Sequence, residues 1–313
     1  MYKIKVGDCV ESMKSLPDNS IQCCVTSPPY FNLRDYGIDG QIGRENSPKE
    51  YIAKLVEVFN EVKRILKPDG TLWVNIGDTW AANRAYQVPS TKGGVKHSPA
   101  QGNGGTGSKV PEGLKPKDLI GIPWMLAFAL RDAGWYLRQD IIWQKPNAMP
   151  ESVKDRCVKS HEYVFLFSKS EKYYFDYEAI QEDAANAGKV VKLGEKSFSK
   201  GQAKGAGVSA SGNGLEDTHT VKDKRNKRSV WSVTTKPIKD AHFAPYPPDL
   251  IEPCILAGTK EGDWVIDPFG GSGTTTIVCE SLGRNSILLE LNPEYVDIAR
   301  NRIQQAEQSL NQP

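Results

Sequence analysis

Apolar runs and amphipathic stretches alternate along the chain, and this alternation predicts an α/β fold. Short apolar runs rich in β-branched residues have the length of buried strands. They lie at residues 2–6, 21–25, 71–76, 136–144, 161–168, 263–267 and 286–290. The run at 161–168 is expected to pair antiparallel, as a hairpin at the edge of the sheet. Longer stretches with apolar residues at helical spacing predict helices that cover the sheet. These helices lie at residues 48–66, 118–134, 248–257 and 292–308.

The run at 21–25 leads into polar residues, two prolines and an aromatic ring. Proline has no N–H for a sheet ladder and favours extended geometry in the residue before it, so the backbone leaves the sheet edge in one stiff direction. The resulting hook presents the Ser27 hydroxyl, the Pro28 carbonyl and the Tyr30 ring where open α/β sheets bind their ligands. This arrangement suits a planar substrate that carries an amine. An isolated Ser-Pro-Pro-Tyr sequence is more often a surface turn, so the motif needs a second observation.

That second observation is a strand, an acidic residue, a glycine-rich turn and a helix start at 264–275. Glycines let a backbone pass close to a ligand and turn sharply into a helix, whose N-terminal N–H groups bind a carboxylate. The lysine of a P-loop does not follow the glycines, and the spacing differs from the G-x-G-x-x-G of nicotinamide sites. The residues of this glycine turn are Asp267, Pro268, Phe269, Gly270, Gly271, Ser272, Gly273 and Thr274.

In this order, the two motifs resemble those of the amino-group DNA methyltransferases that use S-adenosylmethionine, in the permuted (β) class whose catalytic motif precedes the cofactor motif. The resemblance implies a Rossmann-like, mixed seven-stranded methyltransferase sheet, circularly permuted and flanked by helices, with an inserted recognition region. The sheet order of the family places the strand that ends in Glu290 beside the N-terminal strand, and the strand that ends in Asp267 beside the strand before Ser27. The spelling Thr-Ser-Pro-Pro-Tyr is similar to the cytosine-N4 branch, whereas most adenine-N6 members have Asp or Asn in place of Ser27. The implied target is N4 of a flipped cytosine, with adenine N6 as the alternative.

The resemblance also implies the roles of individual residues. The catalytic motif consists of Ser27, Pro28, Pro29 and Tyr30. The glycine turn holds S-adenosylmethionine, while Glu290 accepts hydrogen bonds from its ribose hydroxyls and Asp8 lines the adenosine pocket. A helix N-cap is the alternative interpretation for both acidic residues. Asp78, at the end of the strand 71–76, orients the substrate or cofactor or else caps a turn.

The expected chemistry needs no covalent intermediate. An exocyclic amine is a poor nucleophile because its lone pair is delocalised into the ring, and hydrogen bonds to Ser27 and the Pro28 carbonyl hold the nitrogen toward tetrahedral geometry. Tyr30 stacks on a base that has left the duplex. Cys254 follows a proline, as the nucleophile of cytosine-C5 methyltransferases does, but it lies on the apolar face of the helix 248–257 and is expected in the core.

Two polar, glycine-rich stretches interrupt the pattern. Residues 81–117 have no periodicity and are too long for an ordinary connection, so they predict a mobile loop over the substrate or an insertion without a role. Residues 176–239 carry many lysines and arginines, which predicts a target-recognition insert that binds phosphates and base edges. A solvated charged linker is the alternative. The rest of the chain then forms a catalytic half at 1–175 and a cofactor-binding half at 240–313.

Composition limits the classes of function. With 313 residues, of which 39% are hydrophobic, the chain can bury one large α/β core. The net charge of +2 indicates no overall basic surface, so contacts with DNA must be local. The six cysteines include no C-x-x-C pair, which indicates reduced thiols in the cytoplasm and no metal cluster. No apolar run has the length of a membrane helix, so no membrane partner is expected.

The expected partner is double-stranded DNA, with a homodimer and a cognate restriction endonuclease as further expectations. An RNA or protein methyltransferase would leave the basic insert unexplained. The non-enzyme alternative is a DNA-binding regulator with a relic methyltransferase fold. That alternative predicts degraded motifs, whereas both motifs are intact in this chain.

Overall fold

The computed structural model describes residues 1–33, 37–81, 110–111, 113–192, 218–235 and 246–310. These residues form two compact units. The first unit contains Met1–Phe175 and Ser229–Pro313, and the second contains Asp176–Arg228. The loop predicted at 81–117 lies almost entirely outside the described residues, and so do large parts of the predicted insert at 176–239.

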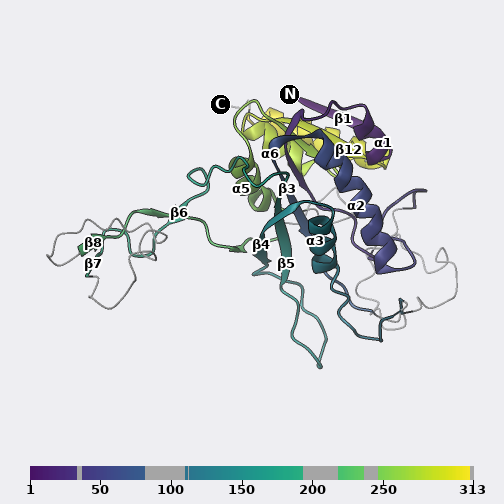
Figure 1. Cartoon of the computed structure of the whole chain (residues 1–313), viewed down its shortest axis with the longest axis horizontal. Helices are drawn as coiled ribbons and strands as arrows, with labels where there is room; N and C mark the ends of the chain where they lie inside the picture. The colour runs from purple at the N-terminus through teal and green to yellow at the C-terminus, as the bar shows by residue number, and fades with distance from the viewer. Residues whose placement is uncertain (34–36, 82–109, 112, 193–217, 236–245, 311–313) are drawn as a thin grey trace. The chain divides into compact units, whose positions relative to one another are not determined.

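The first unit is built on an eight-stranded mixed sheet with the order β1-β12-β11-β2-β3-β5-β4-β10. Of these strands, β1, β12, β3, β5 and β4 are labelled in Figure 1. Neighbouring strands are parallel except at β5, which is antiparallel to both β3 and β4. The predicted permuted, mixed α/β sheet is therefore confirmed, and all seven predicted strands form. The strands are β1 (Tyr2–Val6), β2 (Ile21–Thr26), β3 (Leu66–Ile76), β4 (Tyr136–Gln144), β5 (His161–Ser168), β10 (Val230–Ser232), β11 (Trp264–Asp267) and β12 (Asn285–Glu290).

Two details of the sheet differ from the prediction. An eighth strand, β10, pairs in parallel with β4 at the edge of the sheet. Its three residues are too few to show the alternation of a strand in the sequence. Its Trp231 is 6% exposed, and the indole nitrogen of Trp143 donates to the Val233 carbonyl oxygen at 2.8 Å. The strand β5 was expected at an edge of the sheet but lies between β3 and β4, because β4 and β10 extend the sheet beyond it.

The order of the strands brings the two sequence motifs together. β1 pairs in parallel with β12, with Val6 opposite Glu290. β11 pairs in parallel with β2, with Ile266 opposite Cys24. Parallel strands end at the same edge of a sheet, so the hook after β2, the glycine turn after β11 and the end of β12 share one edge. These neighbours are the ones that the permuted family order predicts.

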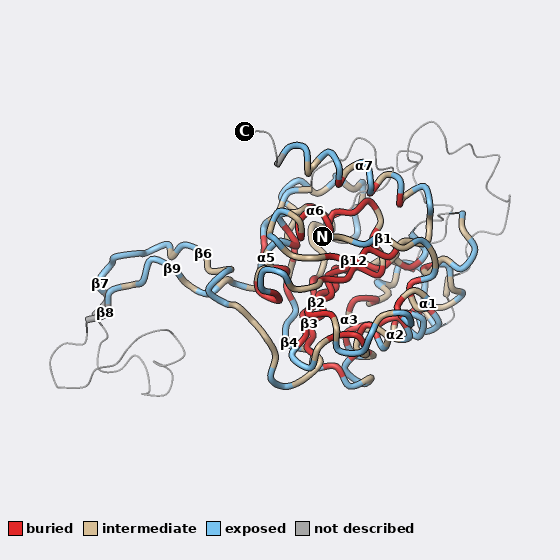
Figure 2. The backbone as a smooth tube through the Cα atoms, turned by 90° about the horizontal axis from the view of Figure 1, so that it is seen from above, coloured by how far each residue is buried: buried red, intermediate tan, exposed pale blue. Residues whose placement is uncertain are grey.

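Helices cover both faces of the sheet, and the buried strands lie between them (Figure 2). One layer contains α1 (Cys9–Lys14), α2 (Pro48–Ile65) and α3 (Ile122–Asp132), and the other contains α5 (Pro248–Gly258), α6 (Thr274–Ser281) and α7 (Pro293–Leu310). α2 begins at Ser47, whose hydroxyl accepts from the Glu50 N–H at 3.2 Å, and its apolar face is buried against the sheet. Cys254 of α5 is 1% exposed, so the prediction that it belongs to the core is confirmed.

The second unit carries two short antiparallel pairs. β6 (Glu182–Asp183) pairs with β9 (Lys224–Arg225), and β7 (Val190–Lys192) pairs with β8 (Thr218–Thr220). Within the first pair, the Glu182 carboxylate accepts from the guanidinium groups of Arg225 at 2.9 Å and Arg228 at 2.6 Å. The recognition role of residues 176–239 stays a prediction.

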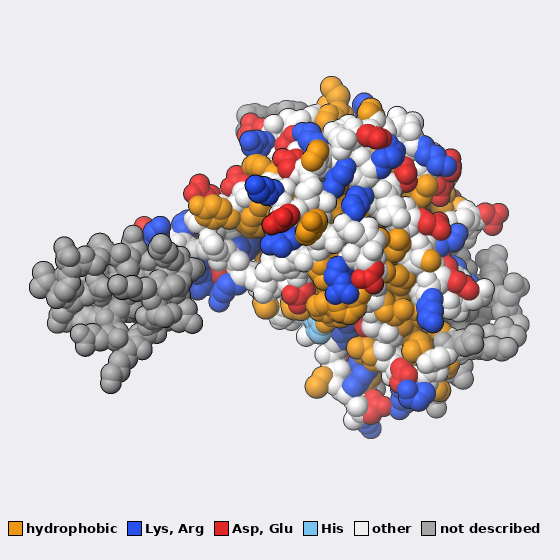
Figure 3. All heavy atoms as spheres, viewed as in Figure 1, with side chains coloured by type: hydrophobic (Ala, Val, Ile, Leu, Met, Phe, Trp, Pro, Cys, Tyr) orange, Lys and Arg blue, Asp and Glu red, His pale blue; other side chains and the backbone are white. Residues whose placement is uncertain are grey.

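On the face of the first unit seen in Figure 3, acidic and basic side chains are interspersed among apolar ones, as the small net charge leads one to expect. Mixed charges of this kind are ordinary for a surface in contact with water. Of the helices in the described ranges, none has the length and apolar character needed to cross a membrane.

Candidate active site

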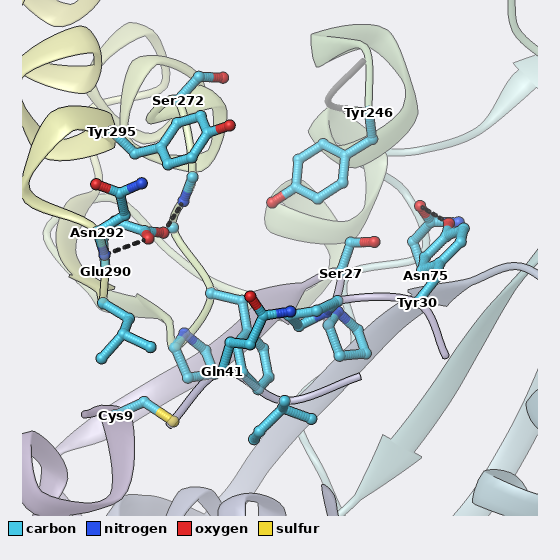
Figure 4. A pocket seen from close by; sticks show the side chains of 18 of the residues that line it. Cys9, Ser27, Tyr30, Gln41, Asn75, Tyr246, Ser272, Glu290, Asn292 and Tyr295 are labelled. Atoms are coloured by element: carbon cyan, nitrogen blue, oxygen red, sulfur yellow. Dashed lines mark hydrogen bonds between the residues drawn. The ribbon is translucent and has the colours of Figure 1, made fainter. Parts of the chain in front are cut away.

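A cavity of about 400 Å³ lies at the carboxyl ends of β2, β11 and β12, and both sequence motifs line it (Figure 4). Its volume is in the range of small-molecule and cofactor sites. The hook forms one side, and the glycine turn with the end of β12 forms the other. The predicted site residues in its wall are Asp8, Ser27, Pro28, Pro29, Tyr30, Pro268, Phe269, Gly270, Gly271, Ser272, Thr274 and Glu290.

The hook is anchored at its second proline and at the tyrosine that follows. The Tyr51 hydroxyl, from α2, donates to the Pro29 carbonyl oxygen at 2.8 Å. The Tyr30 hydroxyl donates to Glu162 Oε2 of β5 at 2.6 Å. Before the prolines, the Ser27 side chain points along the cavity toward Tyr30 and Asn75 (Figure 4). The stiffness expected from the two prolines is thus reinforced by contacts to a helix and to a neighbouring strand.

The glycine turn exposes bare backbone to the cavity because side chains do not fit there. A Cβ on Gly270 would lie 2.2 Å from Leu288 Cγ, far inside van der Waals contact. Gly271 has a φ of +50°, and its N–H donates to Glu290 Oε2 at 2.8 Å. Gly273, with a φ of +80°, precedes α6 and has no side chain to cap the helix. Ligand atoms can therefore approach the N-terminal N–H groups of α6.

Glu290 ends β12 with its carboxylate beside the glycine turn. Oε2 accepts from Gly271, and Oε1 accepts from the Asn292 N–H at 2.8 Å. Burial raises the pKa of this carboxyl, while the backbone hydrogen bonds oppose the shift. A carboxylate has about four acceptor positions, so Glu290 retains capacity for ligand hydroxyls. Its predicted contact with ribose stays a prediction.

Asp8 both caps a helix and lines the cavity, which are the two positions that the sequence suggested. Its Oδ1 accepts from the Glu11 N–H at 2.9 Å and so caps α1. It also lines the cavity, next to the glycine turn and the end of β12. Asp78, in contrast, caps α3: its carboxylate accepts from the N–H groups of Gly121 at 3.0 Å and Ile122 at 3.1 Å.

Asp267 has a different place from the one predicted. In the described part of the chain, the cavity wall includes neither Asp267 nor Gly273. The Asp267 carboxylate is buried beneath the turn, where it accepts from the Phe269 N–H at 3.1 Å and from three hydroxyl groups. These are Thr26 Oγ1 at 2.6 Å, Thr275 Oγ1 at 2.6 Å and Tyr246 Oη at 2.8 Å. Burial raises the pKa of Asp267, and the four hydrogen bonds oppose that rise. The residue supports the turn from below instead of facing a ligand.

Several residues of the cavity were not assigned a role from the sequence. They are contributed by β3, β4, β5, the chain after β10 and the segments that flank α5 and α7. Glu162 carried a signal, because it is a charged residue in an otherwise apolar strand. The other residues, such as Tyr246, carried no distinctive pattern in the sequence. These residues include Asn75, Trp143, Glu162, Thr235, Tyr246, Asn292 and Tyr295.

The cavity fits S-adenosylmethionine in its shape and in its polar groups. The bare backbone of the glycine turn allows a close approach, and the N-terminus of α6 suits the methionine carboxylate. Glu290 suits the ribose hydroxyls, and Phe269 adds an apolar surface beside them. Each of these groups belongs to the side of the cavity opposite the hook.

The position of Asp267 predicts a loss of stability when its carboxylate is removed. In Asp267→Ala, the Thr26 hydroxyl and the Phe269 N–H lose their acceptor, and so does one of the Tyr246 and Thr275 hydroxyls, since these two can still bond to each other. Each unsatisfied buried group costs about 1–3 kcal/mol. We expect the free energy of unfolding in urea to fall by roughly 3 kcal/mol or more, with weaker cofactor binding. Asp8→Ala is the matched control, since loss of an exposed N-cap costs only about 1 kcal/mol. Equal stabilities of the two variants would refute the supporting role of Asp267.

Comparison with known proteins gives the family. A family model described as DNA methylase matches residues 21–301. The Type II methyltransferase M.Cfr9I of Citrobacter freundii is 50% identical over 299 residues, which cover 95% of this chain and 86% of that protein. The Type II methyltransferase M.SmaI of Serratia marcescens is 45% identical over 305 residues, which cover 96% of this chain and 90% of that protein.

Solved structures share the fold. The cytosine-N4-specific PvuII DNA methyltransferase superposes with a TM-score of 0.62 at 20% identity, over 98% of this chain and 93% of that chain. A putative DNA modification methylase from Thermus thermophilus, solved with S-adenosyl-L-methionine, gives a TM-score of 0.57 at 21% identity, over 98% and 96% of the two chains. The match of family, relatives and fold leads to one conclusion: the chain belongs to the DNA methylase family, and its cofactor is S-adenosylmethionine.

Proposed function

We propose that this protein transfers a methyl group from S-adenosylmethionine to the exocyclic N4 of a cytosine flipped out of double-stranded DNA. The proposal rests on one observation: Ser27, Pro28 and Tyr30 line the same cavity as the glycine turn. A methyl donor and an amine acceptor must occupy adjacent positions for a direct transfer. The two motifs line opposite sides of the cavity, as such a transfer requires.

The preference for cytosine rests on residue 27. Serine at this position is typical of the cytosine-N4 branch, and one structure with the same fold is described as cytosine-N4-specific. Adenine N6 is the runner-up, because a hydroxyl and a carbonyl oxygen can accept hydrogen bonds from either amine. The same chemistry would then act on a larger base.

On the cofactor side, Gly270 and Gly271 hold the backbone close to the ligand, and Glu290 accepts from its hydroxyl groups. The N-terminus of α6 binds its carboxylate. When bound, S-adenosylmethionine supplies an electrophilic methyl group. Asp267 acts indirectly, because it supports the turn that carries these groups.

On the substrate side, the Ser27 hydroxyl and the Pro28 carbonyl accept hydrogen bonds from the amine and hold its nitrogen toward tetrahedral geometry. The Tyr30 ring packs beside the extruded base. Burial, together with the neighbouring charge of Glu162, raises the pKa of the Tyr30 phenol well above its ordinary value. The phenol therefore stays neutral and acts as a hydrogen-bond donor, and it is no candidate for a general base.

The mechanism requires no covalent enzyme intermediate. Cys254, which follows a proline as the nucleophile of cytosine-C5 methyltransferases does, is buried in α5, and its thiol lies 3.7 Å from the Leu250 carbonyl oxygen of the same helix. The proton leaves the methylated amine after transfer. Target recognition by residues 176–239, a homodimer, a cognate restriction endonuclease and a cytoplasmic location stay predictions.

The role of the hook is tested by Ser27→Ala. Loss of one positioned hydrogen-bond partner in an active site costs about 10²–10³ in rate, so we expect the single-turnover rate of methyl transfer to fall by roughly 100-fold. The affinity for S-adenosylmethionine, measured by calorimetry, should stay within about twofold, because Ser27 lies on the substrate side.

Cys254→Ala is the control for that experiment. It removes a core thiol, so we expect a somewhat lower unfolding free energy with methyl transfer at the wild-type rate. Complete loss of transfer in a folded Cys254→Ala variant would overturn the direct mechanism. Wild-type activity in Ser27→Ala would exclude a role of the hook in the mechanism.

The target atom is tested by nucleoside mass spectrometry of DNA from cells that express the protein. We expect N4-methylcytosine. N6-methyladenine would replace the first proposal by the runner-up, and the absence of both products in cells that contain folded protein would refute the proposed reaction. The Ser27→Ala variant provides the background level.

A pH dependence follows from Glu290. Its raised pKa means that protonation begins at a higher pH than for an exposed glutamate, and the protonated carboxyl accepts ribose hydrogen bonds less well. We therefore expect the dissociation constant of S-adenosylmethionine to rise as the pH is lowered through that pKa. In Glu290→Gln, binding should be weak and nearly independent of pH over the same interval. An unchanged pH profile in this variant would exclude Glu290 as the titrating group.

A further inference from the structure

We propose that Glu162 is a positioning residue for methyl transfer, which fixes the Tyr30 ring against the substrate side of the cavity. This inference rests on the proposed function of the hook. Glu162 belongs to β5, on the far side of β3 from the hook, and the sequence motifs did not include it. Its carboxylate nevertheless lines the same cavity as Ser27.

Glu162 gathers hydrogen bonds from three separate elements. Its Oε2 accepts from the Tyr30 hydroxyl at 2.6 Å and from Asn75 Nδ2 of β3 at 3.3 Å. Its Oε1 accepts from the ammonium of Lys145, which follows β4. The Tyr30 hydroxyl also lies 3.4 Å from Asn75 Oδ1. A single carboxylate thus joins the hook to the two strands that neighbour β5.

Packing also confines the Tyr30 ring, in addition to the hydrogen bond from its hydroxyl to Glu162. A Cβ on Gly77 would lie 2.7 Å from Tyr30 Cε2 and 3.3 Å from Glu162 Cδ. The ring and the carboxylate therefore lie directly against the backbone at the end of β3, where only glycine leaves enough space. A ring held at its edge and at its hydroxyl has little freedom to turn.

The charge of Glu162 is balanced inside the cavity wall. Glu162 and Lys145 have 16% and 20% of their side chains exposed, and the Lys145 ammonium lies 4.2 Å from the centre of the Trp143 ring. A partly buried ion pair contributes little net stability after its desolvation cost. The adjoining strands already pair along β4 and β5, from Tyr136 opposite Ser168 to Gln144 opposite His161. The position of the pair beside the hook points to a role in the site more than to a role in holding the sheet.

In this arrangement the ring of Tyr30 is available to contact the substrate, while its hydroxyl is bound to Glu162. The Tyr30 hydroxyl also has a hydrogen bond with the Ser27 side chain, so it affects the rate through the orientation of the ring and of Ser27. Displacing a positioning group by about 1 Å can cost roughly 100-fold in rate, so loss of the tether should have a measurable effect. Once the hydrogen bond between Tyr30 and Glu162 is lost, a second change at its other end should lower the rate no further.

A double-mutant cycle tests the inference with the full-length protein, radiolabelled S-adenosylmethionine and unmethylated bacteriophage DNA. Tyr30→Phe removes the tether without leaving a charge unpaired. Glu162→Leu removes its other end, and Lys145→Met is added in a parallel variant so that no lysine is left without its partner. Tyr173→Phe is the matched control, because its hydroxyl accepts from Arg138 Nε at 3.2 Å outside the cavity.

We expect Tyr30→Phe and Glu162→Leu each to lower the single-turnover rate by about 10- to 100-fold, with cofactor affinity unchanged. The double variant should be no slower than the slower single variant, because both changes break one tether. Glu162→Gln should recover most of the rate, since its amide oxygen can still accept from Tyr30. Tyr173→Phe should transfer at the wild-type rate.

Multiplicative losses in the double variant would overturn the inference, and so would a Glu162→Gln variant as slow as Glu162→Leu. Wild-type rates in both Tyr30→Phe and Glu162→Leu would also overturn it, while leaving the proposed function intact. A wild-type protein that methylates no DNA is a separate outcome, which would refute the proposed function itself.

Discussion

The buried carboxylate of Asp267 is the interaction on which the site depends. It accepts from Thr26 at the end of β2 and from Thr275 at the start of α6, so one group joins the strand of the hook to the helix behind the glycine turn. A buried carboxylate is costly unless it is fully hydrogen-bonded, and here four donors from three segments satisfy it. The two motifs are distant in sequence, and this contact lies directly beneath the cavity where they meet.

The second constraint is steric and acts at two glycines. Gly270 leaves space for Leu288 behind the cofactor side, and Gly77 leaves space for Tyr30 on the substrate side. In both places backbone approaches a neighbour more closely than a Cβ permits. Polar anchors and missing side chains thus determine where the two walls of the cavity lie, and the permuted order of the strands determines that they share one sheet edge.

Much of this arrangement could be predicted from the sequence, because strands and glycine turns have local patterns. The seven longer strands and the neighbours of β2 and β12 were predicted, whereas β10 was missed because three residues carry no periodicity. Asp267 was predicted as one of the cofactor-binding residues of the glycine turn, which stays a prediction, whereas its burial beneath the turn was not predicted. Its direction is set by hydroxyls from Thr26 and Tyr246, which are distant in sequence. The partners of Glu162 were likewise beyond local reasoning, since they come from the hook, β3 and the residue after β4.

The central claim is that hook and glycine turn form one site for a methyl donor and its acceptor. A crystal structure with S-adenosylhomocysteine tests this claim most directly. We expect the ligand in the cavity, with its ribose hydroxyls on Glu290, its carboxylate at the N-terminus of α6 and its sulfur directed toward Ser27. A ligand bound outside this cavity, or bound with its sulfur directed away from Ser27, would contradict it.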